Sequence, residues 1–156
     1  MKTLILGIGN PILQNDSIGL RIADKLEEVI RDPEVSVDTV YTGGLNLLDC
    51  IRGYDKVILI DAVNDAKEIG TVSRYELNDL PPGHSSNLHD CSIQEAIQFA
   101  KVLGDTNVPH DIVIIGVSVP PAVEFGEDLD PMVQQAIPQV MSSVLAELDQ
   151  KPRRLP

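Results

Sequence analysis

Two uninterrupted apolar segments constrain the fold of this chain more than any other feature of the sequence. One is KVILID at Lys56–Asp61, and the other is DIVIIGV at Asp111–Val117. Neither segment alternates between apolar and polar residues, as a strand with one face in water would. Strands that are apolar at nearly every position are typical of parallel sheets covered by helices on both faces. The two segments therefore predict the centre of an α/β sheet.

Strand and helix patterns alternate along the rest of the chain. Further strands are predicted at Thr3–Gly7, at Val35–Tyr41 and, with one face exposed, at Gly70–Leu77. Apolar residues at helical spacing predict four helices: one that starts near Asp16, then Leu45–Ile51, Asp90–Leu103 and Pro131–Leu148. This alternation predicts a single three-layer α/β domain, with helices on both faces of a mostly parallel sheet of about five strands.

The length of 156 residues fits one domain. We assign residues 1–150 to this domain and expect residues 151–156, KPRRLP, to form a frayed C-terminal tail. Aromatic residues make up only 3% of the chain, so the core must be aliphatic. The two cysteines, Cys50 and Cys91, form no CxxC motif and predict reduced thiols rather than a disulfide or a zinc site.

Charge and hydropathy exclude several classes of function. Acidic residues outnumber basic ones 24 to 12, which gives a net charge of -12. Such a surface repels phosphate backbones and anionic lipids, so we expect neither nucleic acid nor membrane as a partner. The apolar run at the N-terminus is too short for a signal peptide, and no segment has the length of a membrane span. We expect a monomeric, cytoplasmic protein.

The glycine-rich turn GIGNPILQND at Gly7–Asp16 raises the possibility of a phosphate cradle. A dinucleotide fingerprint requires a third glycine where this chain has Ile12, and Asp16 would repel the pyrophosphate. GIGNP also resembles the start of the peptidyl-tRNA hydrolase signature. The tyrosine and the histidine-bearing element that follow in that family are missing here, and the acidic charge suits a tRNA-handling enzyme badly.

Three residues are predicted to converge at one edge of the sheet. Asp16 follows the first strand, and Asp61 ends the KVILI strand at the same edge, where open α/β sheets bind their ligands. His89 lies at the end of a long loop, just before a predicted helix. Two carboxylates and an imidazole suit a divalent cation such as nickel or zinc, with further positions open to water or substrate.

Each of these residues also has a simpler explanation. Asp16 could cap a helix, Asp61 could cap a turn or a helix N-terminus, and His89 could be an ordinary surface residue. Among the competing side chains, His84 lies in a polar, proline-bearing loop, and His110 precedes a buried strand at the wrong edge. Cys91 next to His89 lacks a separate base, so a structural role is favoured over a nucleophile.

Several motifs, in order along the chain, resemble those of nickel–iron hydrogenase maturation endopeptidases. The opening turn with its acid resembles the family element G-x-G-N-x-x-x-x-D-[DE]-x-x-G. Later motifs with family counterparts are TGGLNLLDCI at Thr42–Ile51, KVILIDAV from Lys56, LHD at Leu88–Asp90, IIGVSVP at Ile114–Pro120 and EFGEDLDP at Glu124–Pro131. Two departures are Asn15, where many members have an aspartate, and Leu45, where threonine is common.

This resemblance implies an endopeptidase that removes a C-terminal peptide from a nickel–iron hydrogenase large-subunit precursor after nickel insertion. It places Asp16, Asp61 and His89 on the family's metal-contacting positions, and these are our candidate catalytic and metal-binding residues. Nickel is the expected metal, held through the precursor. The residues themselves leave two mechanisms open: a bound metal that activates water, or recognition of the precursor's nickel with a carboxylate as base.

Asn10 and the glycine pair Gly43–Gly44 are candidates for lining the substrate groove. Glycines at such a turn allow positive φ or a close backbone approach, and Asn10 could either order its turn or contact the peptide. Two alternatives to the protease are a noncatalytic nickel checkpoint or delivery module with the same ligands and, more distantly, a peptidyl-tRNA hydrolase.

Overall fold

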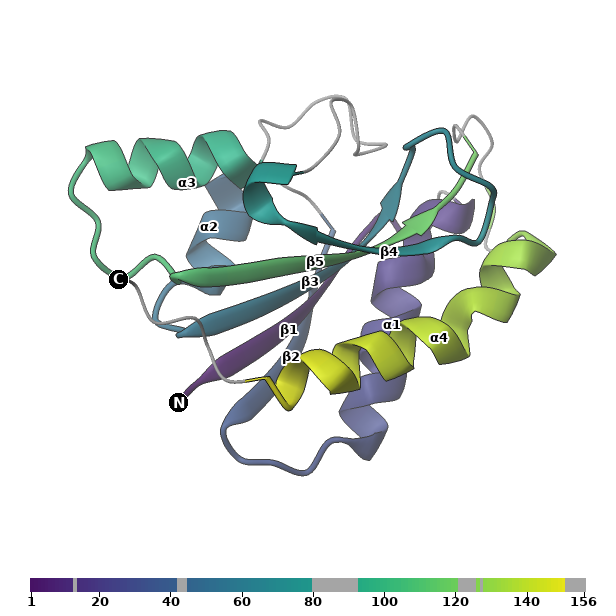
Figure 1. The fold of residues 1–156 in the computed structure, drawn as a ribbon, viewed down its shortest axis with the longest axis horizontal. Coiled ribbons are helices and arrows are strands. Elements are labelled where there is room, and N and C mark those ends of the chain that lie inside the picture. The colour runs from purple at the N-terminus through teal and green to yellow at the C-terminus, as the bar shows by residue number, and fades with distance from the viewer. Residues whose placement is uncertain (13, 42–44, 80–92, 121–125, 127, 151–156) are drawn as a thin grey trace.

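The computed structural model describes residues 1–12, 14–41, 45–79, 93–120, 126 and 128–150 (Figure 1). The strands are β1 (Thr3–Ile8), β2 (Val35–Val40), β3 (Lys56–Val63), β4 (Val72–Glu76) and β5 (Asp111–Ser118). The α-helices are α1 (Ile18–Val29), α2 (Leu45–Ile51), α3 (Ile93–Val102) and α4 (Pro131–Leu148). Two short 3₁₀ helices, η1 (Gln14–Ser17) and η2 (Leu77–Asp79), complete the described elements.

The five strands form one mixed sheet in the order β2-β1-β3-β5-β4. The first four strands in this order run parallel, and β4 joins β5 antiparallel at the edge. The sequence-based prediction of a mostly parallel, five-stranded α/β sheet is therefore confirmed. It also follows that the carboxyl ends of β1, β3 and β5 meet at one edge, which is the edge where the candidate site was predicted.

Helices cover both faces of the sheet, with α1 and α4 on one face and α2 and α3 on the other (Figure 1). The alternation of side chains along β3 shows why that strand is apolar throughout. Ile58 and Ile60 pack into the core shared with α1 and α4, whereas Val57 and Leu59 pack into the core shared with α2 and α3. In the described part of the chain, no helix has both the length and the apolarity needed to cross a membrane.

The element boundaries differ from the predicted ones at two places that concern the site. Asp16 does not begin a helix, because it lies within η1 and the N-cap of α1 is Ser17. Asp61 does not end its strand either, since β3 continues through Val63. The η1 turn and the extension of β3 beyond Asp61 both result from contacts with distant parts of the chain. The periodicity of apolar residues in the sequence does not reveal such contacts.

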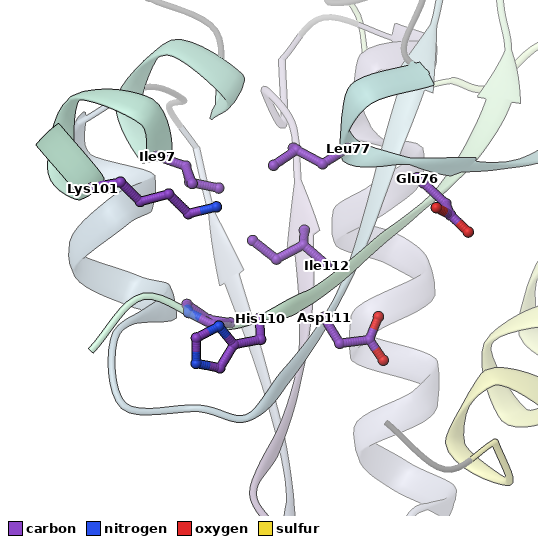
Figure 2. A pocket seen from close by; sticks show the side chains of 8 residues that line it. Glu76, Leu77, Ile97, Lys101, His110, Asp111 and Ile112 are labelled. Carbon is purple, nitrogen blue, oxygen red and sulfur yellow. The ribbon is translucent and has the colours of Figure 1, made fainter. Parts of the chain in front are cut away.

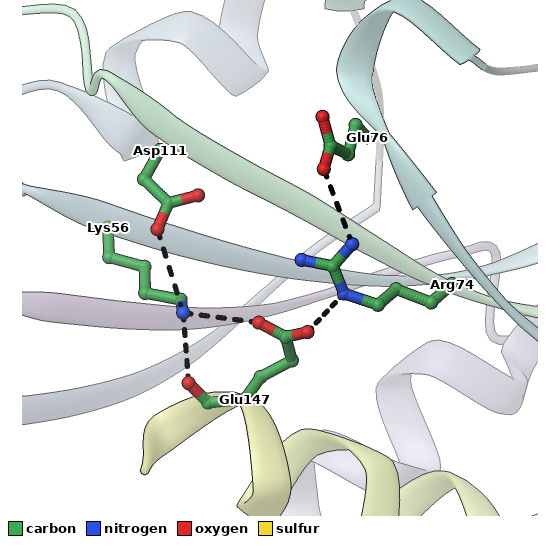
Figure 3. A network of polar contacts seen from close by, with 5 residues as sticks. All are labelled: Lys56, Arg74, Glu76, Asp111 and Glu147. Carbon is green, nitrogen blue, oxygen red and sulfur yellow. Dashed lines mark hydrogen bonds and ion pairs between the residues drawn. The ribbon is translucent and has the colours of Figure 1, made fainter. Parts of the chain in front are cut away.

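A buried ionic network joins α4 to the opposite edge of the sheet, where β3 and β5 begin (Figure 3). Lys56 and Glu147 have side chains only 2% exposed, and their charged atoms lie 3.1 Å apart. The Lys56 ammonium also lies 3.6 Å from an oxygen of Asp111, and Arg74 of β4 bonds to the second oxygen of Glu147. Burial opposes ionisation of Glu147, but the bonds from Arg74 and Lys56 outweigh it and lower the pKa of that carboxyl.

We expect Lys56→Met to lower the free energy of unfolding by about 3–5 kcal/mol, because Asp111 then loses the cation beside it and Glu147 keeps only Arg74. The double variant Lys56→Met, Glu147→Leu should recover much of that loss, since an apolar replacement of a buried pair is often neutral. Urea denaturation of both variants measures the difference. A double variant no more stable than Lys56→Met would show that packing, not the uncompensated charge, causes the loss.

Candidate active site

The glycines of the opening turn allow the chain's own backbone to approach closely. A Cβ atom on Gly9 would lie 2.1 Å from the backbone oxygen of Asp16, and one on Gly19 would lie 2.3 Å from that of Ile60. Such distances are impossible for any residue with a side chain, so glycine is required at both positions. These contacts press η1 and the start of α1 against the ends of β1 and β3. Backbone, not phosphate, therefore occupies the space that the glycines leave.

The carboxylate of Asp16 is held in place by this turn. Its side chain is buried, with the residue only 5% exposed, and one carboxylate oxygen accepts the backbone N–H of Asn10 at 2.8 Å. The side-chain oxygen of Asn10 in turn accepts the N–H of Ile12 at 3.1 Å. Asn10 thus orders the turn, which was one of its two predicted roles. The helix-cap explanation of Asp16 is wrong, since Ser17 is the N-cap of α1.

Asn15 has a structural role that suits an amide as well as a carboxylate. Its side-chain oxygen accepts the backbone N–H of Asp130 at 2.7 Å, immediately before α4. Beside it, the N–H of Gln14 donates to the carbonyl of Gly126, and the N–H of Gly126 donates to that of Ile12, both at 2.9 Å. These bonds fix η1 to the segment before α4. Asn15 keeps this acceptor while removing one negative charge from the neighbourhood of Asp16.

Asp61 lies on β3 near its carboxyl end. Its neighbours Ile60 and Ala62 both pack toward α1 and α4, so the Asp61 side chain points to the other face of the sheet. In the ladder Asp61 pairs with Gly116 of β5, which has no side chain to crowd the carboxylate. Burial of the carboxyl, and secondly the charge of Asp16, raise the pKa of Asp61 well above its ordinary value.

The structure therefore brings Asp16 and Asp61 within electrostatic reach of each other. Two carboxylates placed in this way favour holding a proton or a cation between them. Among the described residues, no group of three or more His, Cys, Asp and Glu side chains could hold a metal ion. A divalent cation between the two carboxylates would offset the charge of Asp16, which is the second cause, after burial, of the raised pKa of Asp61.

The remaining predicted site residues lie outside the described part of the chain. These are His89, Gly43 and Gly44, together with the competing residues His84 and Cys91. His110 is described, and it lies just before β5, at the edge opposite Asp16 and Asp61. There it borders a separate cavity of about 170 Å³, beside Lys101 and Asp111 (Figure 2).

The sequence analysis missed one acid that supports the site. The side chain of Asp65, just beyond β3, is 2% exposed and accepts the hydroxyl groups of Tyr75 at 2.6 Å and Ser118 at 2.8 Å. Burial opposes its ionisation, but these bonds outweigh it and lower the pKa of Asp65. Asp65 thus ties the end of β3 to β4 and β5. A second acid four residues after Asp61 was the only signal in the sequence.

Asp61→Asn should stabilise the protein at neutral pH in the absence of metal. The folded pKa of Asp61 lies above its ordinary value of 3.8, so the ionised carboxyl destabilises the fold. This cost is complete above the folded pKa and absent below the unfolded one. The gain in melting temperature from Asp61→Asn, measured with chelator present, should therefore be largest near pH 7 and shrink as the pH falls toward 4.

Asp65→Asn is the matched control, with the opposite sign. The pKa of Asp65 is lowered by folding, so its ionised form stabilises the protein above the unfolded pKa, and this contribution is lost as the pH falls. Asp65→Asn should lower the melting temperature at pH 7. The same sign for both variants at pH 7 would contradict the assignment of the two environments.

Comparison with known proteins places this chain in a family. The sequence model of the family described as hydrogenase maturation protease matches residues 20–147. The chain is 28% identical over 152 residues to the hydrogenase 2 maturation protease of Escherichia coli K12, covering 95% of this chain and 91% of that protein. It is 29% identical over 153 residues to the hydrogenase expression/formation protein HupD of Thiocapsa roseopersicina, covering 96% of this chain and 68% of that protein.

Solved structures agree with the sequence matches. The hydrogenase maturating endopeptidase HybD from Escherichia coli superposes with a TM-score of 0.79 at 27% identity, over 95% of this chain and 92% of that one. The maturation protease HycI from Thermococcus kodakarensis shares the fold, with a TM-score of 0.72 at 21% identity over 96% and 93% of the two chains. The resemblance drawn from the sequence motifs is confirmed: this chain belongs to the hydrogenase maturation protease family.

Proposed function

We propose that this protease removes the C-terminal extension of a nickel–iron hydrogenase large-subunit precursor, and that it does so after nickel has been inserted. The observation that carries the proposal is the coupled pair of carboxylates, Asp16 and Asp61, at the carboxyl edge of the sheet. Family membership supports the reaction, and the pair supplies the chemistry. It favours the protease over the peptidyl-tRNA hydrolase considered from the sequence.

In this proposal the nickel belongs to the substrate. Asp16, Asp61 and His89 contact the nickel ion already bound to the precursor, and that contact positions the bond to be cut. A site with few protein ligands leaves coordination positions for groups of the precursor. Selectivity for the nickel-loaded precursor then follows, because the two neighbouring carboxylates repel each other until a cation lies between them.

Asp61 is the proposed general base. Burial raises the pKa of Asp61 independently of the charge of Asp16, which makes its carboxylate a better proton acceptor near neutral pH than an ordinary aspartate. Asp61 takes a proton from the attacking water as the oxygen adds to the peptide carbonyl, and it returns the proton to the leaving nitrogen. Asp16, held by the N–H of Asn10, contacts the cation. Asn10, Gly43 and Gly44 remain candidates for the groove that holds the peptide.

The proposal also includes the domain bounds, the location in the cell and the oligomeric state. Residues 1–150 form the protease domain, with residues 151–156 as a tail, and the protein acts as a cytoplasmic monomer. These are predictions from the sequence and from the acidic composition.

Nickel-loaded precursor should be shortened by the protein, whereas nickel-free precursor should keep its full mass. Asp16→Asn retains an oxygen for the N–H of Asn10 but removes the charge, so we expect a folded variant whose cutting rate is at least about 100-fold lower. Intact mass spectrometry of the precursor over time measures both effects. Glu28→Gln, an exposed acid farther along α1, is the control and should cut normally.

The outcomes separate the candidate functions. Efficient cutting of nickel-free precursor would contradict the role of nickel and leave the protease standing. Binding of nickel-loaded precursor without any change in its mass would instead indicate the noncatalytic checkpoint module.

His84 and His89 should differ in their effect on metal binding. His89→Ala should weaken nickel or zinc binding by more than the roughly 10–100-fold that loss of a supporting residue costs, because it removes a ligand. His84→Ala is the matched control and should change the affinity little. Isothermal titration of each variant with the metal measures the affinity. A larger effect at His84 would move the imidazole ligand to that residue.

A further inference from the structure

A groove runs between α1 and the outer edge of β2, next to the candidate active site. It contains a cavity of about 240 Å³. One wall consists of Ser17, which directly precedes α1, and of Leu20, Arg21 and Asp24 of α1. These three residues lie three, four and seven positions after Ser17, so all four lie on one side of the helix. Thr39 and Tyr41, at the end of β2 and just beyond it, form the other wall, and Pro11 closes one end.

The outer edge of β2 presents backbone groups to this groove. β2 is the end strand of the sheet. The carbonyls of Glu34 and Val40 accept the N–H groups of Thr3 and Gly9 at 3.0 and 3.2 Å. The backbone N–H and C=O groups of the even-numbered residues of β2 therefore point toward β1. The backbone groups of Val37 and Thr39 therefore point away from the sheet.

One of these outward groups already carries a substitute partner. The N–H of Thr39 donates to the carboxylate of Asp38, the residue before it, at 2.8 Å. This oxygen lies where the carbonyl oxygen of an added strand would lie, and a short local bond of this kind is readily exchanged for another acceptor. The edge is thus chemically suited to pair with a polypeptide in an extended conformation.

The groove adjoins the turn that holds the candidate catalytic carboxylate Asp16. Pro11 directly follows Asn10, whose N–H holds Asp16, and Ser17 directly follows Asp16. The hydroxyl of Ser17 donates to the carbonyl of Gln14 at 2.6 Å and accepts the Nε–H of Arg21 at 3.1 Å. The same η1 turn therefore fixes both Asp16 and one wall of the groove.

We propose that an extended segment of the precursor, adjacent to the bond that is cut, adds to the outer edge of β2 and places one side chain in this cavity. The inference rests on the proposed function, because it names where that substrate lies. Main-chain bonds to Thr39 hold the segment in register. The cavity is smaller than a typical pocket for a small-molecule ligand and has the size of one side chain. Tyr41, which is 61% exposed, covers that side chain.

Thr39→Pro tests the main-chain pairing. Proline removes an N–H that points away from β1, so the ladder between β1 and β2 keeps all its bonds. With nickel-loaded precursor we expect KM to rise at least ten-fold while kcat stays within two-fold, since the lost contact lies away from the reacting atoms. Ser36→Ala, an exposed residue of β2 whose backbone groups face β1, should leave both constants unchanged. Hydrogen exchange of the β1 amides reports whether the ladder is intact.

Tyr41→Ala tests the cavity independently and keeps the proposal falsifiable if Thr39→Pro fails to fold. It should raise KM in the same way. In a third measurement, precursor added to the Asp16→Asn variant should slow hydrogen exchange at the amides of Val37 and Thr39.

The docking site would be overturned if both Thr39→Pro and Tyr41→Ala keep the wild-type KM, or if they lower kcat without changing KM. It would also be overturned if the precursor leaves hydrogen exchange along β2 unchanged. A dimer that pairs through β2 and that Thr39→Pro dissociates would overturn it as well. Normal cutting by the wild-type protein in those cases would leave the proposed function intact. A precursor that the wild-type protein neither binds nor cuts would overturn the proposed function, and the docking site with it.

Discussion

The close approach of η1 to the ends of β1 and β3 is the constraint on which the site depends. Gly9 and Gly19 have backbone oxygens of other residues at 2.1 and 2.3 Å from where a side chain would start. Any bulk at these positions would move η1 away from the sheet, and with it Asp16. The distance between Asp16 and Asp61 is thus set by backbone contacts, which are stiffer than side-chain packing because they leave no rotamer through which to adjust. Burial is the larger cause of the raised pKa of Asp61, and this spacing sets the smaller contribution that comes from Asp16.

Buried acids have different surroundings at the two ends of the sheet. At the amino end, Lys56, Arg74 and Glu147 compensate one another in a nearly closed network, so burial there leaves little tendency to bind anything else. At the carboxyl end, the pKa of Asp61 is raised, first by burial of its carboxyl and secondly by the neighbouring acid Asp16. A carboxyl perturbed in this way is costly to the fold and is typical of functional sites. The compensated network and the candidate active site therefore lie at opposite edges of the sheet.

The sequence predicted the sheet well because its signal is local. The apolar runs at Lys56–Asp61 and Asp111–Val117 need only their own residues to indicate a strand buried on both faces, and they became β3 and β5. Parallel connections then put Asp16 and Asp61 at one edge. The bond from Asp130 to Asn15 could not be predicted, since its partners lie 115 positions apart and neither has an unusual context. The same holds for Lys56 and Glu147, which are 91 positions apart.

The glycine-rich turn illustrates how one local sequence can serve different chemistry. In a phosphate-binding loop, glycines expose backbone N–H groups to an anion. Here the N–H of Asn10 is already bonded to the Asp16 carboxylate, which makes an anion supplied by the protein itself the occupant of that position. The N–H of Asn10 is therefore not available to bind an external anion. Glycines can thus serve a turn whose N–H groups bind an acid of the same chain as readily as a turn that binds an external anion.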